Sequence, residues 1–217
     1  MDFKLLKTNN MGKMLKPYLT RFDVQLIGRD AADRIDKLLT ERKIHYDVKQ
    51  TVFVCLLRGG LFYFADLTRK LAQRHNVDIQ LEFLRVHSYT GNGQSGELII
   101  EGGNDVLKQF AGKDVWLVDD IIDTGNTMIS LVKEFHKLPP EDQPTGIFVT
   151  ALLMRRKFAQ SEDMAKLVEA PINALVIPGM VEDDAWLVGY GMEDEGKYRN
   201  LEGIYKLVDD TIPEVKK

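Results

Sequence analysis

The stretch that decides the fold of this chain is Val115-Trp-Leu-Val-Asp-Asp-Ile-Ile-Asp-Thr-Gly-Asn-Thr127. Its first four residues are apolar and predict a short buried strand. Two carboxylates, Asp119 and Asp120, follow the strand directly, and Asp123 comes three residues later. A strand that runs from apolar residues into acids and a polar turn predicts a ligand site at its carboxyl end.

The last four residues of this stretch, Thr124-Gly125-Asn126-Thr127, form a small polar turn that opens a helix. Gly125 lets the backbone approach a ligand closely, the threonines supply hydroxyls, and free N–H groups at the helix start favour a phosphate. Carboxylates beside a phosphate would repel it, so we expect Asp119 and Asp120 to bind sugar hydroxyls or to help hold Mg²⁺. The alternative is a plain strand end with solvated aspartates and an N-capping threonine, which the order of these residues disfavours.

Strands and helices alternate along the rest of the chain. Apolar runs predict strands at residues 51–57, 78–84, 115–118, 146–154 and 174–177. Helical periodicity predicts helices at residues 31–43, 61–74 and 127–137. This order predicts an α/β protein with a mostly parallel sheet covered on both faces. Residues 1–22 give no clear pattern, and the turn formers of residues 88–96 predict a mobile loop.

Size and composition indicate one globular domain, residues 1–217, that needs no disulfide or structural metal. The net charge is -4, so no basic field attracts nucleic acid. No apolar run is long enough to cross a membrane and the first residues lack signal-peptide features, which predicts a cytoplasmic protein. The only cysteine, Cys55, lies in an apolar strand and is expected to be a buried thiol rather than a nucleophile.

Residues 115–127 resemble the phosphoribosyl pyrophosphate motif of the purine phosphoribosyltransferases, in a form close to the hypoxanthine-guanine enzymes. The resemblance implies the type I phosphoribosyltransferase fold, in which helices flank a central, mostly parallel sheet. It also implies a small hood from the terminal segments, about residues 1–30 and 178–217. Matching patches run in the family's order from about Val24 to Leu207 and so cover most of the chain.

The family motif implies a role for each residue of the acidic stretch. Asp119 and Asp120 would hold the ribose hydroxyls, directly or through Mg²⁺. Asp123 would be the catalytic residue that handles the proton at purine N7. The 5-phosphate would be bound by Asp123 and by the turn that follows it, namely Thr124, Gly125, Asn126 and Thr127.

Matches elsewhere imply pyrophosphate and purine sites. Pyrophosphate would be bound by Arg58, Gly59, Ser88, Tyr89 and Arg199, and relatives often have a cis peptide before the residue at position 58. The purine would be bound by Arg155, Trp186, Leu187 and Glu193, with Trp186 as its stacking partner. Mg²⁺ would be held by Glu193, Asp119 and Asp120.

Two residues depart from the family pattern. Arg155 stands where relatives usually have a lysine that donates to the purine 6-carbonyl, and arginine is longer and planar. Glu193 stands where relatives usually have an aspartate that binds the metal, and Asp194 follows it, so either carboxylate is a candidate ligand. Both departures bear on base preference and metal geometry.

The implied reaction is purine salvage, the transfer of the 5-phosphoribosyl group from phosphoribosyl pyrophosphate to N9 of hypoxanthine or guanine. The products are IMP or GMP and pyrophosphate, and relatives are usually homodimers or homotetramers. Alternatives are a xanthine-preferring enzyme and a non-catalytic, nucleotide-binding regulator on the same fold. A receiver-type signalling domain also has an acidic pocket at a strand end, but its acidic pair normally lies near the N-terminus.

Overall fold

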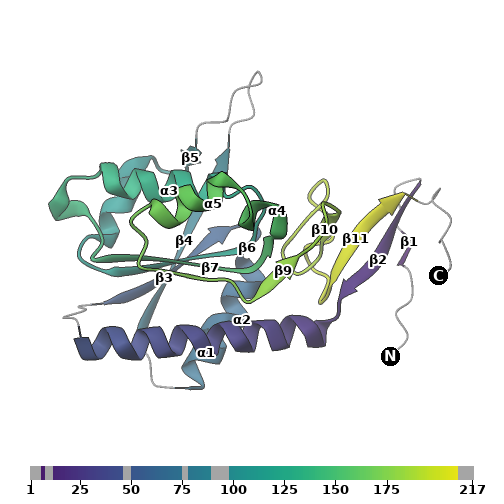
Figure 1. Ribbon diagram of the computed structural model, residues 1–217, viewed down its shortest axis with the longest axis horizontal. Helices are drawn as coiled ribbons and strands as arrows, with labels where there is room; N and C mark the ends of the chain where they lie inside the picture. The colour runs from purple at the N-terminus through teal and green to yellow at the C-terminus, as the bar shows by residue number, and fades with distance from the viewer. Residues whose placement is uncertain (1–5, 8–11, 46–49, 75–77, 89–97, 210–217) are drawn as a thin grey trace.

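The computed structural model describes residues 6–7, 12–45, 50–74, 78–88 and 98–209 (Figure 1). These residues form a seven-stranded core sheet and a separate four-stranded sheet. The core sheet has the strand order β5-β4-β3-β6-β7-β8, and β9 also pairs with β7. The four-stranded sheet has the order β1-β2-β11-β10 and joins the two ends of the chain.

The core sheet is almost entirely parallel. Among its described strands only the pairing of β4 with β5 is antiparallel. Its strands are β3 (Thr51–Leu57), β4 (Ile79–Ser88), β5 (Leu98–Ile100), β6 (Asp114–Ile122), β7 (Gly146–Arg155), β8 (Ala174–Val176) and β9 (Gly179–Val181). Every residue of β7 is buried, which explains why its sequence is apolar except at Thr150 and Arg155 and does not alternate.

Helices cover both faces of the core sheet (Figure 1). One face carries α1 (Arg21–His45) and α2 (Leu61–Ala72), which share one hydrophobic core with the sheet. The other carries α3 (Asn126–Lys137) and α5 (Glu162–Glu169), which belong to a second core. Three short elements, η1 (Asn104–Phe110), η2 (Pro140–Asp142) and α4 (Arg156–Ala159), complete the described helices. The predicted α/β fold class is therefore confirmed.

The four-stranded sheet, called the hood below, consists of β1 (Leu6–Lys7), β2 (Lys13–Leu19), β10 (Trp186–Val188) and β11 (Ile204–Asp209). Its neighbouring strands are all antiparallel within the described residues. The hood lies beyond one end of the core sheet, on the side of β9 and α4 (Figure 1). Strands from both ends of the sequence therefore meet beside the carboxyl ends of β6 and β7.

The largest differences from the predicted boundaries concern α1, β6 and β4. The helix predicted at residues 31–43 begins at Arg21, so residues 21–30 belong to the helix that covers the core and not to the hood. The reason is a capping box, in which Thr20 Oγ1 accepts from Asp23 N at 2.9 Å and Asp23 Oδ2 accepts from Thr20 N at 2.8 Å. Strand β6 continues to Ile122, so the acidic pair lies within the strand, and β4 continues to Ser88.

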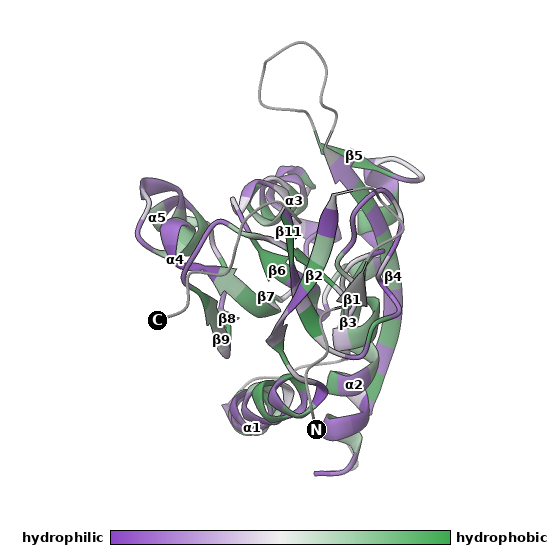
Figure 2. Ribbon diagram, turned by 90° about the vertical axis from the view of Figure 1, so that its right-hand side faces the viewer, coloured by the Kyte–Doolittle hydropathy of each residue, from purple (hydrophilic) through white to green (hydrophobic). Residues whose placement is uncertain are grey.

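Figure 2 shows the hydropathy behind this layering, with apolar residues concentrated in the core strands and polar residues on the outer side of α1. Cys55 is fully buried in β3, as predicted. Burial, followed by the nearby Asp119 and Asp120 carboxylates, raises the pKa of its thiol to about 12. In the part of the chain described, no helix is long and apolar enough to span a membrane.

Candidate active site

Strand β6 presents the two carboxylates of the acidic pair to different surroundings. Successive side chains on a strand point to opposite faces of the sheet. Asp119 accordingly lines a hollow at the start of α3, whereas Asp120 lines a larger cavity beneath the hood. The pair is fixed by its own backbone, because Asp119 Oδ1 accepts from Asp120 N at 2.9 Å and Asp120 Oδ1 accepts from Ile121 N at 2.8 Å.

The acidic pair is electrostatically unfavourable when both members are charged. Burial raises the pKa of Asp119 well above its ordinary value, and the neighbouring Asp120 carboxylate raises it further. Burial also raises the pKa of Asp120, although hydrogen bonds and the Arg199 guanidinium oppose this shift. A cation or a set of hydroxyl donors at the pair would therefore relieve a strain that the fold itself creates.

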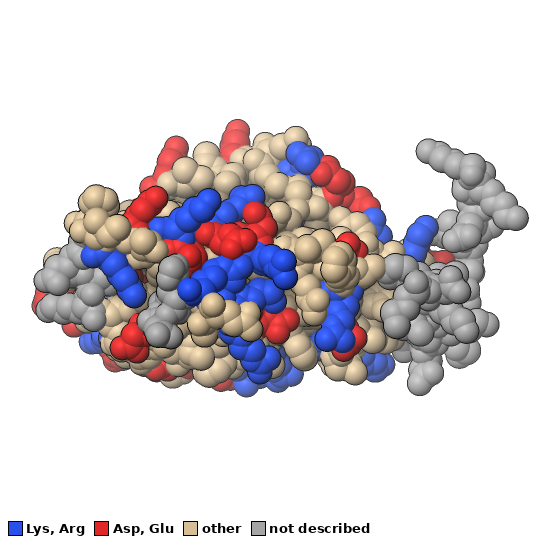
Figure 3. All heavy atoms as spheres, turned by 90° about the horizontal axis from the view of Figure 1, so that it is seen from below, with Lys and Arg blue, Asp and Glu red and all other residues tan. Residues whose placement is uncertain are grey.

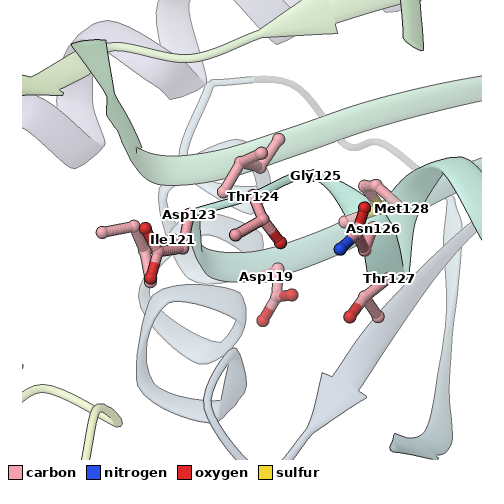
Figure 4. A pocket seen from close by; sticks show the side chains of 9 residues that line it. Asp119, Ile121, Asp123, Thr124, Gly125, Asn126, Thr127 and Met128 are labelled. Carbon is pink, nitrogen blue, oxygen red and sulfur yellow. The ribbon is translucent and has the colours of Figure 1, made fainter. Parts of the chain in front are cut away.

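The first hollow, of about 100 Å³, surrounds the start of α3 (Figure 4). Its described walls come from a single segment and comprise Asp119, Ile121, Ile122, Asp123, Thr124, Gly125, Asn126, Thr127 and Met128. The first N–H groups of a helix have no partner within the helix, and the helix dipole adds a partial positive charge there. Such a hollow suits a phosphate-sized anion.

Gly125 is required at this turn for two reasons. Its φ is +72°, in the left-handed region that glycine adopts without strain. A Cβ at this position would also lie 2.3 Å from Cζ of Phe158, which belongs to α4. Any larger residue would therefore strain the turn and displace the ring that packs behind it.

The second cavity, of about 280 Å³, lies between the core sheet and the hood. It is lined by Asp120, Ile121, Asp123, Arg155, Trp186, Leu187, Met192, Glu193 and Arg199. These residues come from β6 and the turn after it, from β7, from β10 and from the loop between β10 and β11. Asp123 and Ile121 line this cavity and the phosphate-sized hollow alike, so the side chain of Asp123 stands at their border.

Arg155, at the end of β7, connects three parts of the second cavity. Its Nε donates to Asp123 Oδ1 at 3.1 Å. Its Nη1 donates to the carbonyl oxygen of Asp183, and its Nη2 donates to that of Ala185 at 2.8 Å. The guanidinium is almost fully buried, and it ties the Asp123 turn to the loop that leads into β10.

Trp186 and Arg199 shape the other wall of this cavity. Trp186 is 57% exposed, a high value for a tryptophan, yet its indole N–H is held by Glu193 O at 2.9 Å. Arg199 Nη2 lies 2.8 Å from Glu193 Oε1, and Nη1 donates to the carbonyl of Gly191. An exposed aromatic face and a guanidinium therefore face the same space as Asp123.

The loop after β3 lies against Asp120 of the acidic pair. The Leu57–Arg58 peptide is cis. A Cβ on Gly59 would lie 2.4 Å from Asp120 Oδ2, and one on Gly191 would lie 2.0 Å from Gly59 O. Glycines therefore let this loop, the acidic pair and the loop after β10 come into contact.

Comparison with known proteins decides the family. Residues 26–191 match the family model for the phosphoribosyl transferase domain, which is most of the chain. This chain belongs to the phosphoribosyltransferase family. The family and fold expected from residues 115–127 are thereby confirmed.

Individual relatives agree with this assignment. A hypoxanthine-guanine-xanthine phosphoribosyltransferase of Tritrichomonas foetus is 31% identical over 79% of this chain and 84% of its own. A hypoxanthine phosphoribosyltransferase of Escherichia coli K12 is 33% identical over 72% of this chain and 78% of its own. A solved Trypanosoma cruzi hypoxanthine phosphoribosyltransferase mutant, in a ternary substrates complex, superposes with a TM-score of 0.69 at 25% identity. That superposition covers 89% of this chain and 95% of the other.

The structure separates the two candidate metal ligands of this phosphoribosyltransferase. Glu193 lines the second cavity, and its carboxylate contacts Arg199 and the backbone N–H of Gly196. Asp194 lies 3.5 Å from Lys13 Nζ on β2 and is not among the described residues that line the cavity. No cluster of three or more potential ligands occurs in the described ranges. Mg²⁺ commonly uses one or two carboxylates plus substrate phosphates, and Glu193 and Asp120, which line the same cavity, would meet that requirement.

Some predicted residues lie outside the two cavities. Within the described chain, Arg58 and Gly59 lie beside the second cavity rather than in its wall, and Arg58 is exposed. Ser88 ends β4, and Tyr89 lies outside the described residues. The expected role of Ser88 and Tyr89 at the pyrophosphate therefore stays a prediction.

The sequence prediction missed several residues of the site, among them Ile122 and Met128 in the wall of the first hollow. Ile121 and Met192 line the second cavity. Each is adjacent in sequence to a predicted site residue, so this adjacency could have identified them. Asp183 and Lys206 support the cavity wall through a side-chain contact between separate elements. No local pattern in the sequence indicates that contact.

Proposed function

We propose that this phosphoribosyltransferase transfers the 5-phosphoribosyl group of phosphoribosyl pyrophosphate to N9 of hypoxanthine or guanine, giving IMP or GMP and pyrophosphate. This is a purine salvage reaction. The observation that carries the proposal is the position of Asp123, at the border of a phosphate-sized hollow and of a cavity with an exposed tryptophan. A carboxylate at that border is within reach of both the ribose and the base.

The first hollow would bind the 5-phosphate. Its chemistry is that of an anion site, with the start of α3, the hydroxyls of Thr124 and Thr127 and the close backbone at Gly125. Asp119 at its edge would accept hydrogen bonds from ribose hydroxyls. Arg199 and Arg58 offer positive charge on the other side, where the pyrophosphate would lie.

The second cavity would bind the purine between Trp186 and the end of β7. A guanidinium has five N–H donors. Among the described residues, three of those of Arg155 donate to Asp123, Asp183 and Ala185, which leaves two for a ligand. Those donors suit a 6-oxo group, an acceptor, whereas the 6-amino group of adenine would present donors to donors. Hypoxanthine, guanine and xanthine all satisfy this condition.

The reaction needs charge stabilisation and one proton transfer. The bond between ribose C1 and the pyrophosphate oxygen breaks, the bond between C1 and purine N9 forms, and the imidazole ring of the base loses a proton. Asp123 would handle that proton at N7, with Arg155 holding the carboxylate in place. The remaining gain would come from positioning and electrostatic stabilisation in a site closed by the hood.

We also propose Mg²⁺ as the cofactor, held by Glu193 and Asp120, which line the same cavity, whereas Asp119, also expected as a ligand, lines the phosphate-sized hollow. When bound, it would neutralise charge on the pyrophosphate leaving group. Glu193→Gln should raise the Mg²⁺ concentration for half-maximal rate by about tenfold, because a carboxylate ligand is lost. Asp194→Asn is the matched control and should leave it unchanged, since Asp194 faces Lys13. Equal effects of the two variants would reject Glu193 as the ligand.

The partners would be small substrates and further copies of this chain, in a homodimer or homotetramer located in the cytoplasm. Exposed apolar side chains on α2 and β4 support an assembly surface, namely Leu61, Phe62, Leu81 and Phe83. Figure 3 shows acidic and basic residues intermixed over α1 and α2. This face therefore lacks the uniformly basic surface that attracts nucleic acid. Light scattering on the purified protein tests the assembly, and cell fractionation tests the location.

The deciding experiment is a spectrophotometric assay with phosphoribosyl pyrophosphate, Mg²⁺ and each of hypoxanthine, guanine, xanthine and adenine in turn. Turnover of 6-oxopurines, with adenine inactive, is the expected result. A strong preference for xanthine would select the xanthine enzyme instead. Binding of phosphoribosyl pyrophosphate without turnover of any base would select the non-catalytic regulator.

A further inference from the structure

A charged pair connects the hood to the loop that carries Trp186. Lys206, on β11, donates through Nζ to Asp183 Oδ2, in the loop between β9 and β10. The ammonium of Lys206 also lies 4.4 Å from the ring centroid of Tyr18 on β2. The Lys206 hydrogen bond holds the pKa of Asp183 below its ordinary value, which favours the charged carboxylate. Strand β11 therefore holds this loop residue through Lys206, and β2 contacts Lys206 through Tyr18.

Asp183 is held from the core sheet as well. Its carbonyl oxygen accepts from Arg155 Nη1, and its Oδ1 accepts from Ala185 N at 3.1 Å. Arg155 in turn holds Asp123. Asp183, three positions before Trp186, is therefore bound to the hood through its carboxylate and to β7 through its carbonyl oxygen.

The neighbouring Asp184 forms an ordinary exposed ion pair and provides a comparison for Asp183. Asp184 lies 3.7 Å from Lys157, with the two side chains 76% and 81% exposed. The Lys206 side chain is only 20% exposed and packs against the hood. Adjacent aspartates thus have different surroundings, and only Asp183 joins two layers of the fold among the described contacts.

We propose that Asp183 and Lys206 are positioning residues for the purine, which fix the distance between Trp186 and Arg155 and so set affinity for the base. This rests on the proposed function, since it takes a purine as the ligand of the second cavity. Within the described chain neither residue lines that cavity, so both act through the loop. If the loop is already ordered before the purine binds, the binding free energy is not reduced by the entropy of ordering the loop.

The proposal predicts an effect on the base and none on phosphoribosyl pyrophosphate. The phosphate hollow is built from residues 119–128 and makes no use of the hood loop among its described walls. Loosening Asp183 should therefore raise the KM for hypoxanthine and the Kd for GMP. The Kd for phosphoribosyl pyrophosphate should stay constant, which separates this role from general destabilisation.

The test compares Asp183→Asn and Lys206→Met with Asp184→Asn as the matched control. Calorimetric titration with GMP should show about a three- to tenfold higher Kd for each of the first two variants. Their double variant should show no more than either alone, because both remove the same contact. Lys206→Arg should restore wild-type affinity, and Asp184→Asn should match the wild type throughout.

Two outcomes would overturn the proposal. One is a wild-type Kd for GMP in Asp183→Asn. The other is an equal weakening of GMP and phosphoribosyl pyrophosphate, which would indicate a general structural role. Failure of the wild-type protein to bind GMP or to use any purine is a different result, because it rejects the proposed function itself.

Discussion

The two cavities of this phosphoribosyltransferase are built in opposite ways. The described walls of the phosphate-sized hollow come from residues 119–128, one strand end and one helix start. The walls of the larger cavity come from positions between Asp120 and Arg199, on two core strands, one hood strand and a loop. The first site therefore depends on one local segment, whereas the second forms only when the hood packs against the core sheet.

Asp123 belongs to both cavities, and its variant should have the largest effect. Asp123→Asn should lower kcat by roughly 10²- to 10⁴-fold, the usual range for loss of an acid–base group. The Kd for phosphoribosyl pyrophosphate should remain near the wild-type value, because the turn and helix start are unchanged. Stopped assays and direct binding measure the two quantities. Full turnover by this variant would remove Asp123 from proton transfer.

Gly125→Ala should impair only the phosphate-sized hollow. A strained φ costs about 1–3 kcal/mol, and the added Cβ would meet the Phe158 ring at 2.3 Å. We expect kcat/KM for phosphoribosyl pyrophosphate to fall roughly tenfold to a hundredfold on that basis. Gly112→Ala is the control, since Gly112 has a φ of +67° but no atom within 4 Å of an added Cβ. Equal losses in both variants would mean that stability, and not the hollow, is affected.

Arg155→Lys should affect only the dispersed site, and by less. An ammonium has three donors and cannot hold Asp123, Asp183 and Ala185 while also serving the base. The KM for the base should rise by about fivefold, and the ranking of hypoxanthine, guanine and xanthine should change. The KM for phosphoribosyl pyrophosphate should not. An unchanged ranking of bases would remove Arg155 from base recognition.

The smallest expected effect concerns the pH dependence of stability. The folded protein raises the pKa of Asp119, so the free energy of unfolding falls as pH rises from about 4, the ordinary value, through the raised pKa. Asp119→Asn removes this loss and should raise Tm by roughly 2–4 °C at pH 8 in EDTA. The two proteins should converge near pH 4. A lower Tm for the variant at pH 8 would contradict the assignment.

The contrast between the two cavities also explains which parts of the site could be predicted from the sequence. The hollow was predictable because strand, acids, glycine and helix start follow one another in a few residues, and each has a local physical meaning. The start of α1 was also readable in principle, since Thr20 and Asp23 form a capping box. It was missed although Val24 and Gly28 extend the buried face of α1, because apolar residues such as Phe22, which is 66% exposed, blur the pattern there.

The larger cavity could be predicted only through the family resemblance. Trp186, Arg155 and Arg199 each look like ordinary core or surface residues when taken alone. Their convergence depends on the pairing of β10 with β11 and on where β7 ends. The three hydrogen bonds of Arg155 and the contact between Asp183 and Lys206 join positions far apart in sequence. No spacing rule specifies such contacts.

Cys55 offers a way to time the opening of this molecule. Its thiol lies in β3 between β4 and β6, with both faces of the sheet covered. Reagents attack the thiolate, and a pKa of about 12 leaves almost none at neutral pH even if a reagent could enter. Modification must therefore wait until the central sheet separates. The rate at which a thiol-reactive dye is incorporated therefore measures how often the central sheet opens.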